Sequence, residues 1–264
     1  RRQRQMCIRD RSAPGHSAAL LDKPNNNLAV EYCKAIIEQN VEMQPIALPR
    51  QGADHGQALT ESSHTAFASA SALRALWAEG GAAALAPYVP EKALKLYKQA
   101  EYDGKYTDFA VMGHCELALL RAACAGQAPF AAVRGVSEGL EHRLENAVRE
   151  TASLPALLDA LTTVRYPRAR MRRLAMDAAL GYTAQTPALP PYLHLLGARK
   201  EALPLPGETA LPLSHSLARL ARENETCAQM AAAQNRASDL GALCRAKPEP
   251  MGGIYRQKII FLTN

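Results

Sequence analysis

A chain of 264 residues, of which 48% are hydrophobic, can bury a substantial core, and this excludes an intrinsically disordered protein. Only 5% of the residues are aromatic, and alanine is abundant in helical periodicity, so the composition favours helices over a β-sandwich. The formal net charge is +6, but five arginines and one aspartate in residues 1–12 account for most of it. No apolar run is long enough for a membrane span, and no secretory signal opens the chain, so we expect neither.

Residues 1–12 differ in composition from the rest of the chain. They resemble a translated sequencing adapter, and we expect a non-native leader that takes no part in the fold. The alternative is a genuine basic arm that binds nucleic acid. Without this leader the remaining residues carry only +2, so the net charge by itself indicates no particular partner.

The cysteines and histidines indicate neither a disulfide framework nor a zinc site. The six cysteines include no C-x-x-C pair, and the seven histidines are scattered without the spacing of metal ligands. Free cysteines among apolar residues behave as small hydrophobic side chains. We therefore expect a reducing, cytoplasmic location and no metal held by protein side chains.

The first predicted element is a helix over residues 27–37, where apolar residues recur at helical spacing. Asn25 or Asn26 is expected to cap its start. The short apolar run 44–48 predicts a buried strand, and the polar residues 51–64 predict a loop.

A second helix is predicted to open near Ser69 and to run to Trp77, before the glycine pair 80–81 interrupts it. Pro87 and Pro90 then indicate a domain boundary.

Beyond this boundary the periodicity is almost wholly helical. The apolar stripes that predict helices are Leu94 and Tyr97; Leu117, Leu120 and Cys124; Leu140, Leu144, Ala147 and Val148; and Met171, Leu174 and Ala178. Further helices are predicted from Pro155 to Leu161 and over residues 217–232, and a short strand over residues 259–262. The predicted fold class is α/β plus α, with part of an α/β domain followed by a mostly α-helical domain.

The start of the second predicted helix has residues that suit phosphate binding. Helix N-termini present unpaired N–H groups, and the helix dipole favours an anion there. Ser69 and Ser71 add hydroxyl donors, and Arg74 adds a fixed positive charge one turn later. The simpler alternative is that Ser69 is an ordinary helix cap and Arg74 is solvated.

Residues 165–173 contain five arginines and no acidic residue. On a helix, Arg168 and Arg172 share one face, Arg165 is placed to flank them, and Met171 turns inward. Such a cluster suits RNA phosphates, and a solvated basic face is the alternative.

Five segments occur in the order and approximate spacing of the tRNA(Met) cytidine acetate ligase family. Pro24–Tyr32 resembles the family's P-N-N-I-L-A-I-E-Y stretch. Phe67–Arg74 resembles its S-A-T-x-I-R motif, which is similar to the I-S-S-T-x-x-R phosphate motif of nucleotidyltransferases. Val136–Leu144 resembles its E-G-L-E-x-R helix, Thr163–Leu174 its K-R-Y-T-x-x-R-I-x-R-x-L segment, and Tyr192–Gly197 its Y-x-x-x-L-G.

The resemblance implies a Rossmann-like nucleotidyltransferase domain, a helical C-terminal region and an ATP-dependent ligase activity. Such an enzyme forms acetyl-adenylate from acetate and ATP, and then acetylates N4 of the wobble cytidine of elongator tRNA(Met). Magnesium normally accompanies the ATP phosphates. By motif, the implied ATP contacts are Asn25, Arg50, Ser69, Ser71 and Arg74, and the implied tRNA contacts are Arg165, Arg168, Arg170, Arg172 and Arg173.

The chain departs from the family pattern at several points. Ser71 stands where threonine is usual, and Pro167 replaces a threonine, which is compatible with a helix that starts there. Three consecutive asparagines leave the register of Asn25 open by one residue. Nothing before Pro24 resembles the family's paired-histidine loop that cradles ATP phosphates, so we expect an N-terminally truncated copy.

The expected domains are therefore the C-terminal part of a nucleotidyltransferase domain over residues 13–86 and a helical tRNA-binding domain over residues 87–264. Two other functions stay open on the residues alone. One is a non-catalytic RNA-binding module, and the other is an adenylyltransferase for another small substrate, in which the arginine cluster would be incidental.

Overall fold

The structure, a computed structural model, describes residues 24–48, 68–202 and 209–261. Contacts divide the chain into two compact units, residues 1–72 and residues 73–264, and each unit is described by itself. The expected domain boundary near residue 86 stays a prediction.

The described part of the first unit is helical at its start. Helix α3 (Pro24–Glu38) confirms the first predicted helix. Because the helix already includes Pro24, Asn25 and Asn26 lie inside its first turn, and the prediction that one of them caps it is wrong. Proline suits this position, since its φ is preset and the first helical N–H has no partner within the helix.

The predicted buried strand at residues 44–48 is also wrong. These residues are irregular, and Ile46 and Leu48 are 81% and 87% exposed. A strand needs a hydrogen-bonded neighbour, and none of the described residues pairs with this segment. The loop predicted at 51–64 lies outside the described residues.

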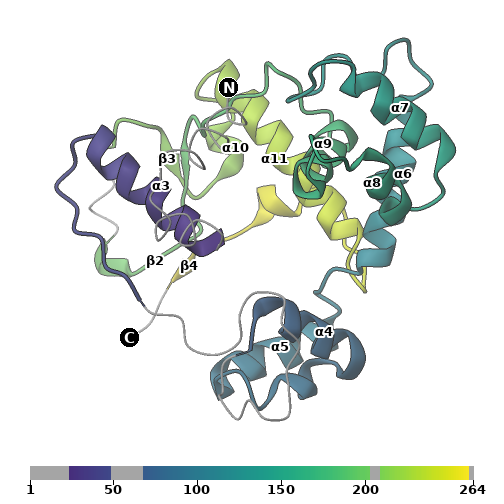
Figure 1. The fold of residues 1–264 in the computed structure, drawn as a ribbon. Coiled ribbons are helices and arrows are strands. Elements are labelled where there is room, and N and C mark those ends of the chain that lie inside the picture. Colours follow the sequence, from purple (N-terminus) through teal and green to yellow (C-terminus); the bar gives the residue numbers. More distant parts are fainter. Residues whose placement is uncertain (1–23, 49–67, 203–208, 262–264) are drawn as a thin grey trace, which may run out of the picture. The chain divides into compact units, whose positions relative to one another are not determined.

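The second unit is mainly helical (Figure 1). Helix α4 (Ala70–Gly80) crosses the boundary between the units and confirms the helix predicted from Ser69. The elements that follow are η1 (Ala82–Leu85), α5 (Glu91–Asp103), α6 (Phe109–Ala123), α7 (Leu140–Glu150), α8 (Leu154–Leu161), α9 (Arg168–Ala179), η2 (Lys200–Ala202), α10 (Leu217–Leu220), α11 (Glu225–Leu243) and η4 (Gly253–Arg256). Within the part of the chain that is described, no helix is long and apolar enough to cross a membrane.

Within the described ranges, four strands of two residues each form two small parallel pairs. Strand β1 (Leu193–His194) pairs with β3 (Leu213–Ser214), and β2 (Gly197–Ala198) pairs with β4 (Ile260–Phe261). Strand β4 confirms the short strand predicted near the end of the chain. The other three were not predicted, because two residues are too few to show alternation.

Helices α6, α7, α8 and α9 pack together around the larger hydrophobic core. All four residues of the predicted stripe on α7 are buried, and so are Met171, Leu174 and Ala178 on α9. Local signals set the helix starts. The Asp108 side chain accepts hydrogen bonds from two N–H groups of α6, and Ser153 caps α8 ahead of Pro155.

One prediction for the second unit needs correction. The helix predicted over residues 217–232 is two helices, because the Asn224 side chain accepts a hydrogen bond of 2.9 Å from the Cys227 N–H and starts α11 afresh. Helix α5 confirms the helix predicted from Leu94 and Tyr97, and none of its residues is fully buried. Tyr97 is exposed and instead meets the Trp77 ring edge-on, with ring centroids 5.6 Å apart.

Candidate nucleotide and RNA sites

Ser69 and Ser71 come together at the start of α4. Ser69 is buried, and its hydroxyl oxygen accepts a hydrogen bond of 3.2 Å from the Ala72 N–H. The same oxygen lies 3.0 Å from the Ser71 hydroxyl oxygen. Ser69 is therefore the helix cap that the simpler alternative expected. Arg74 is exposed on the same helix, one turn further on.

The structure describes only one of the two other expected ATP contacts. Asn25 is exposed on the first turn of α3, and Arg50 lies outside the described residues. Among the four expected ATP residues that the structure describes, only Ser69 and Ser71 are joined directly by a hydrogen bond.

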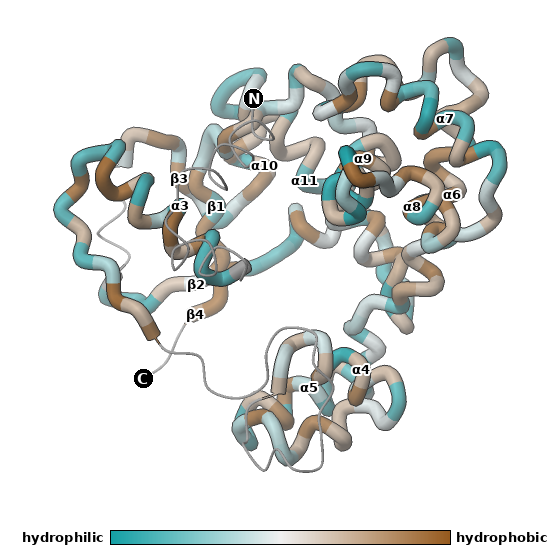
Figure 2. Tube along the Cα trace, in the orientation of Figure 1, coloured by the Kyte–Doolittle hydropathy of each residue, from teal (hydrophilic) through white to brown (hydrophobic). Residues whose placement is uncertain are grey.

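Residues 168–173 of the arginine segment form the first half of α9, and Arg165 precedes the helix. Figure 2 shows both hydrophilic and hydrophobic colour on α9. Pro167 occupies the cap position with φ −60°, which is compatible with the helix that begins at Arg168. Met171 is buried, whereas Arg172 and Arg173 are exposed. Helical spacing alone therefore places the arginines on the solvent side of the helix.

Arg165 and Arg170 lie on one side, against the ring of Tyr166. Their guanidinium carbons are 5.6 Å and 5.0 Å from the ring centroid, within the range of cation–π attraction. Arg165 also forms an ion pair with Glu138, which has a positive φ of 57° just before Gly139. Arg165 thus contacts Tyr166 together with Arg170. A polar pocket of about 530 Å³ opens here, lined by Glu138, Arg143, Asn146, Glu150, Arg165 and Tyr166 among others.

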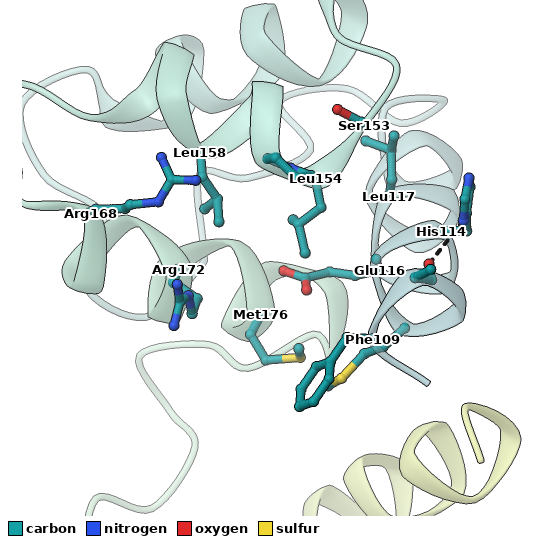
Figure 3. A pocket seen from close by; sticks show the side chains of 14 residues that line it. Phe109, His114, Glu116, Leu117, Ser153, Leu154, Leu158, Arg168, Arg172 and Met176 are labelled. Carbon is teal, nitrogen blue, oxygen red and sulfur yellow. Dashed lines mark hydrogen bonds between the residues drawn. The ribbon is translucent and has the colours of Figure 1, made fainter. Parts of the chain in front are cut away.

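Arg168 and Arg172 share one face of α9, as expected. Both line a second pocket, of about 570 Å³ (Figure 3). Arg168 forms an ion pair with Asp159 of α8. Among the residues that the structure describes, neither Arg172 nor Arg173 forms an ion pair. The sequence segment contains no acid, but the fold supplies two from elsewhere: Glu138, in the turn before α7, pairs with Arg165, and Asp159 of α8 pairs with Arg168.

Glu116 of α6 points into the same pocket and was not among the expected site residues (Figure 3). It is only 2% exposed, and its Oε1 atom has no hydrogen-bond partner among the described residues. Burial raises the pKa of Glu116 from 4.5 to about 7, against the opposing effect of the Arg172 charge. One signal in the sequence would have indicated it, because an acid four residues before the buried Leu120 falls on the apolar face of its helix.

No group of three or more residues that suit a metal ion gathers within the described ranges. The described residues that line these two pockets therefore do not supply the three or more ligands of a protein-built metal centre.

The family profile described as HIGH Nucleotidyl Transferase matches residues 2–250 of the chain. Among curated proteins, the tRNA(Met) cytidine acetate ligase of Listeria monocytogenes serotype 4b is 28% identical over 186 residues, which is 70% of this chain and 46% of that protein. The protein of the same name from Listeria welshimeri is 30% identical over 183 residues, 69% of this chain and 45% of that protein. The chain therefore spans about half the length of the curated relatives it matches.

The fold is similar to that of two crystal structures of Thermotoga maritima TmcAL. The apo form has a TM-score of 0.77 at 20% identity, over 92% of this chain and 62% of that one. The form bound with alpha-thio ATP has a TM-score of 0.75 over 92% and 61%. Together with the profile match, this likeness confirms the predicted fold class, a nucleotidyltransferase part followed by a helical region. The chain belongs to the HIGH nucleotidyl transferase family.

Proposed function

We propose that this chain is part of an ATP-dependent tRNA-modifying enzyme that acetylates N4 of the wobble cytidine of elongator tRNA(Met). Three observations support this proposal. The family is one of nucleotidyl transferases, the curated relatives are named tRNA(Met) cytidine acetate ligase, and a structurally similar protein binds an ATP analogue. The observation that carries the RNA part is the basic solvent face of α9.

In the proposed reaction, an oxygen of acetate attacks the α-phosphate of ATP, acetyl-adenylate forms and pyrophosphate leaves. The acetyl group then passes to the cytidine N4, and AMP is released. Because negative charge grows on the phosphates in the first step, the protein must supply positive charge and hydrogen-bond donors there. We assign this role to Ser69, Ser71 and Arg74 of α4, with Asn25 and Arg50 as further ATP contacts and Mg²⁺ as the companion ion of the phosphates.

We assign the tRNA phosphates to the arginines of residues 165–173. Arg172 and Arg173 carry this assignment best, since both are exposed and no described acid neutralises either one. Arg165 and Arg168 keep part of their charge available, because each is exposed to solvent on one side, with side-chain exposures of 60% and 42%. Arg170 lies over the ring of Tyr166 in a cation–π contact. An RNA base could stack on either of these two flat groups.

The domain assignment follows from these roles. We propose that residues 13–86 form the C-terminal part of the nucleotidyltransferase domain and residues 87–264 a helical tRNA-binding domain. A tRNA substrate and free cysteines fit the cytoplasm as the place of action.

The test of the catalytic proposal is ATP–pyrophosphate exchange with and without acetate, on this chain and on the longest version that its gene encodes. Acetate-dependent exchange supports the ligase. Exchange that requires a different carboxylic acid indicates an adenylyltransferase for another small substrate. If neither version shows exchange while tRNA binding persists, the protein is an RNA-binding module and the ligase proposal fails.

The test of the RNA proposal is the affinity of the chain for tRNA(Met) as a function of salt. Arg173→Gln should weaken binding and reduce the slope of log K against log salt by about one, as expected for the loss of one phosphate contact. Arg222→Gln is the matched control, because Arg222 is an exposed arginine outside α9. Equal effects of both variants would mean that the α9 face has no special role.

A further inference from the structure

The pocket lined by Arg168 and Arg172 contains a buried acid, Glu116, that has no role in phosphate binding. Glu116 is almost completely buried, and its Oε1 atom has no partner in the described part of the fold. Leaving a polar group buried without a hydrogen bond costs stability, and more so for a carboxyl group. Arg172, although it lines the same pocket, forms no ion pair with this acid. A ligand that donates a hydrogen bond would supply the missing partner.

The walls of the pocket limit what that ligand is. Leu154 of α8 and Met176 of α9 lie next to the Glu116 carboxyl group, and Leu158 also lines the pocket, so the surroundings of this acid are mainly apolar (Figure 3). Phe109, at the start of α6, is 72% exposed although it lines the same pocket. The volume of about 570 Å³ is within the range of pockets for small molecules and accommodates a flat aromatic ring system.

The charged residues lie at the side of the pocket that α9 forms. Arg168 and Arg172 line this side, and both belong to the face that we assign to RNA phosphates. A ligand that fills the pocket and also meets this face therefore combines a flat, hydrogen-bond-donating ring with a nearby phosphate. An unstacked nucleotide has both parts, and single-stranded RNA is commonly recognised through bases that are turned out into such pockets.

We propose that the Glu116 pocket binds a nucleobase turned out of a single-stranded part of the RNA, whose exocyclic amino group donates to the Glu116 carboxyl group. The inference rests on the proposed RNA-binding function and names its base-reading element. Carboxyl groups accept from the cytosine amino group in protein–DNA readout, and the same chemistry applies to adenine and guanine. Uracil has no amino group and leaves the acid without this donor. Phe109 offers a ring for stacking, and Arg172 meets the phosphate next to the base.

The experiment compares the affinity of the full chain for RNA hairpins that differ at one loop position. One hairpin has only uridine in its loop, and the others carry a single cytidine, adenosine or guanosine there. We expect the chain to bind at least one amino-bearing hairpin about tenfold more tightly than the uridine hairpin, the scale of one good base contact. Glu116→Met, of similar length but without a hydrogen-bonding carboxyl group, should remove this preference.

Two further variants separate base reading from phosphate binding and from misfolding. Arg173→Gln should weaken all hairpins by the same factor, because Arg173 does not line the pocket. Glu116→Gln keeps an acceptor oxygen and should retain part of the preference. This variant still tests the role of the Glu116 side chain if the methionine variant does not fold.

Equal affinity of the unmodified chain for all hairpins, or a preference that survives in Glu116→Met, overturns the base pocket while RNA binding by the arginine face stands. Absence of binding to every hairpin, together with absence of binding to tRNA(Met), rejects the proposed RNA function and the base pocket with it.

Discussion

The titration of Glu116 gives a prediction with a defined sign and size. Burial raises the pKa of Glu116 from 4.5 to about 7 in the folded chain. The folded state therefore retains a proton that the unfolded state has lost over this range, and the free energy of unfolding falls as the pH rises from about 4.5 to about 7. The shift corresponds to about 3 kcal/mol, and the conversion is appropriate because Glu116 is only 2% exposed.

The perturbation is Glu116→Gln, which is uncharged at every pH and mimics the protonated acid. We expect the variant to gain stability relative to the unmodified chain as the pH rises, with most of the ~3 kcal/mol appearing between pH 5 and pH 8. Above about pH 8 the difference should stay constant, because the acid is then ionised in both states. Comparison of the two proteins removes the contribution of all other titrating groups.

The assay is urea unfolding of both proteins at pH 5 and at pH 8, with the free energy of unfolding taken from each transition. A difference between the proteins that is the same at both pH values would refute the reasoning. It would mean that Glu116 is already ionised in the folded chain at pH 5, as in a close ion pair with Arg172.

Two more predictions concern the packing of the second unit and the start of α4. Leu144 is fully buried in the core formed by α6 to α9, so Leu144→Ala should lower the free energy of unfolding by about 3 kcal/mol in urea titrations; a loss below about 1 kcal/mol would contradict this packing. Ser69→Ala removes the acceptor of the Ala72 N–H and should cost about 1 kcal/mol, whereas Ser71→Ala, which leaves this cap intact, should cost less. Equal losses in the two serine variants would contradict the assignment of Ser69 as the cap.

The sequence by itself determined the helices whose signals are local. The stripe of Leu140, Leu144, Ala147 and Val148 repeats at helical spacing, and burial of this stripe followed directly. Pro155 near the start of α8 and the glycine pair at the end of α4 are also local signals, because each marks a helix end within one turn. The resemblance of five ordered segments to a ligase family depended only on the residues, and the family match agrees with it.

Predictions failed where a local pattern has more than one structural outcome. The apolar residues 44–48 have the composition of a buried strand, but a strand exists only if a neighbour pairs with it. Asn224 interrupts the predicted helix at 217–232 because its side chain competes with the helix for a backbone N–H group. The two-residue strands are set by pairing between segments far apart in sequence, such as Gly197 with Ile260.

Only the tertiary structure decided the chemistry around the arginines. The segment itself contains no acid, yet Arg165 pairs with Glu138 and Arg168 with Asp159, because the turn before α7 and helix α8 bring these carboxylates within reach. The same packing of α6 against α9 and α8 buries Glu116 and encloses the pocket. Periodicity places a residue on a face of its helix, but what that face meets, and so whether an acid there is solvated, paired or buried, depends on contacts between distant parts of the chain.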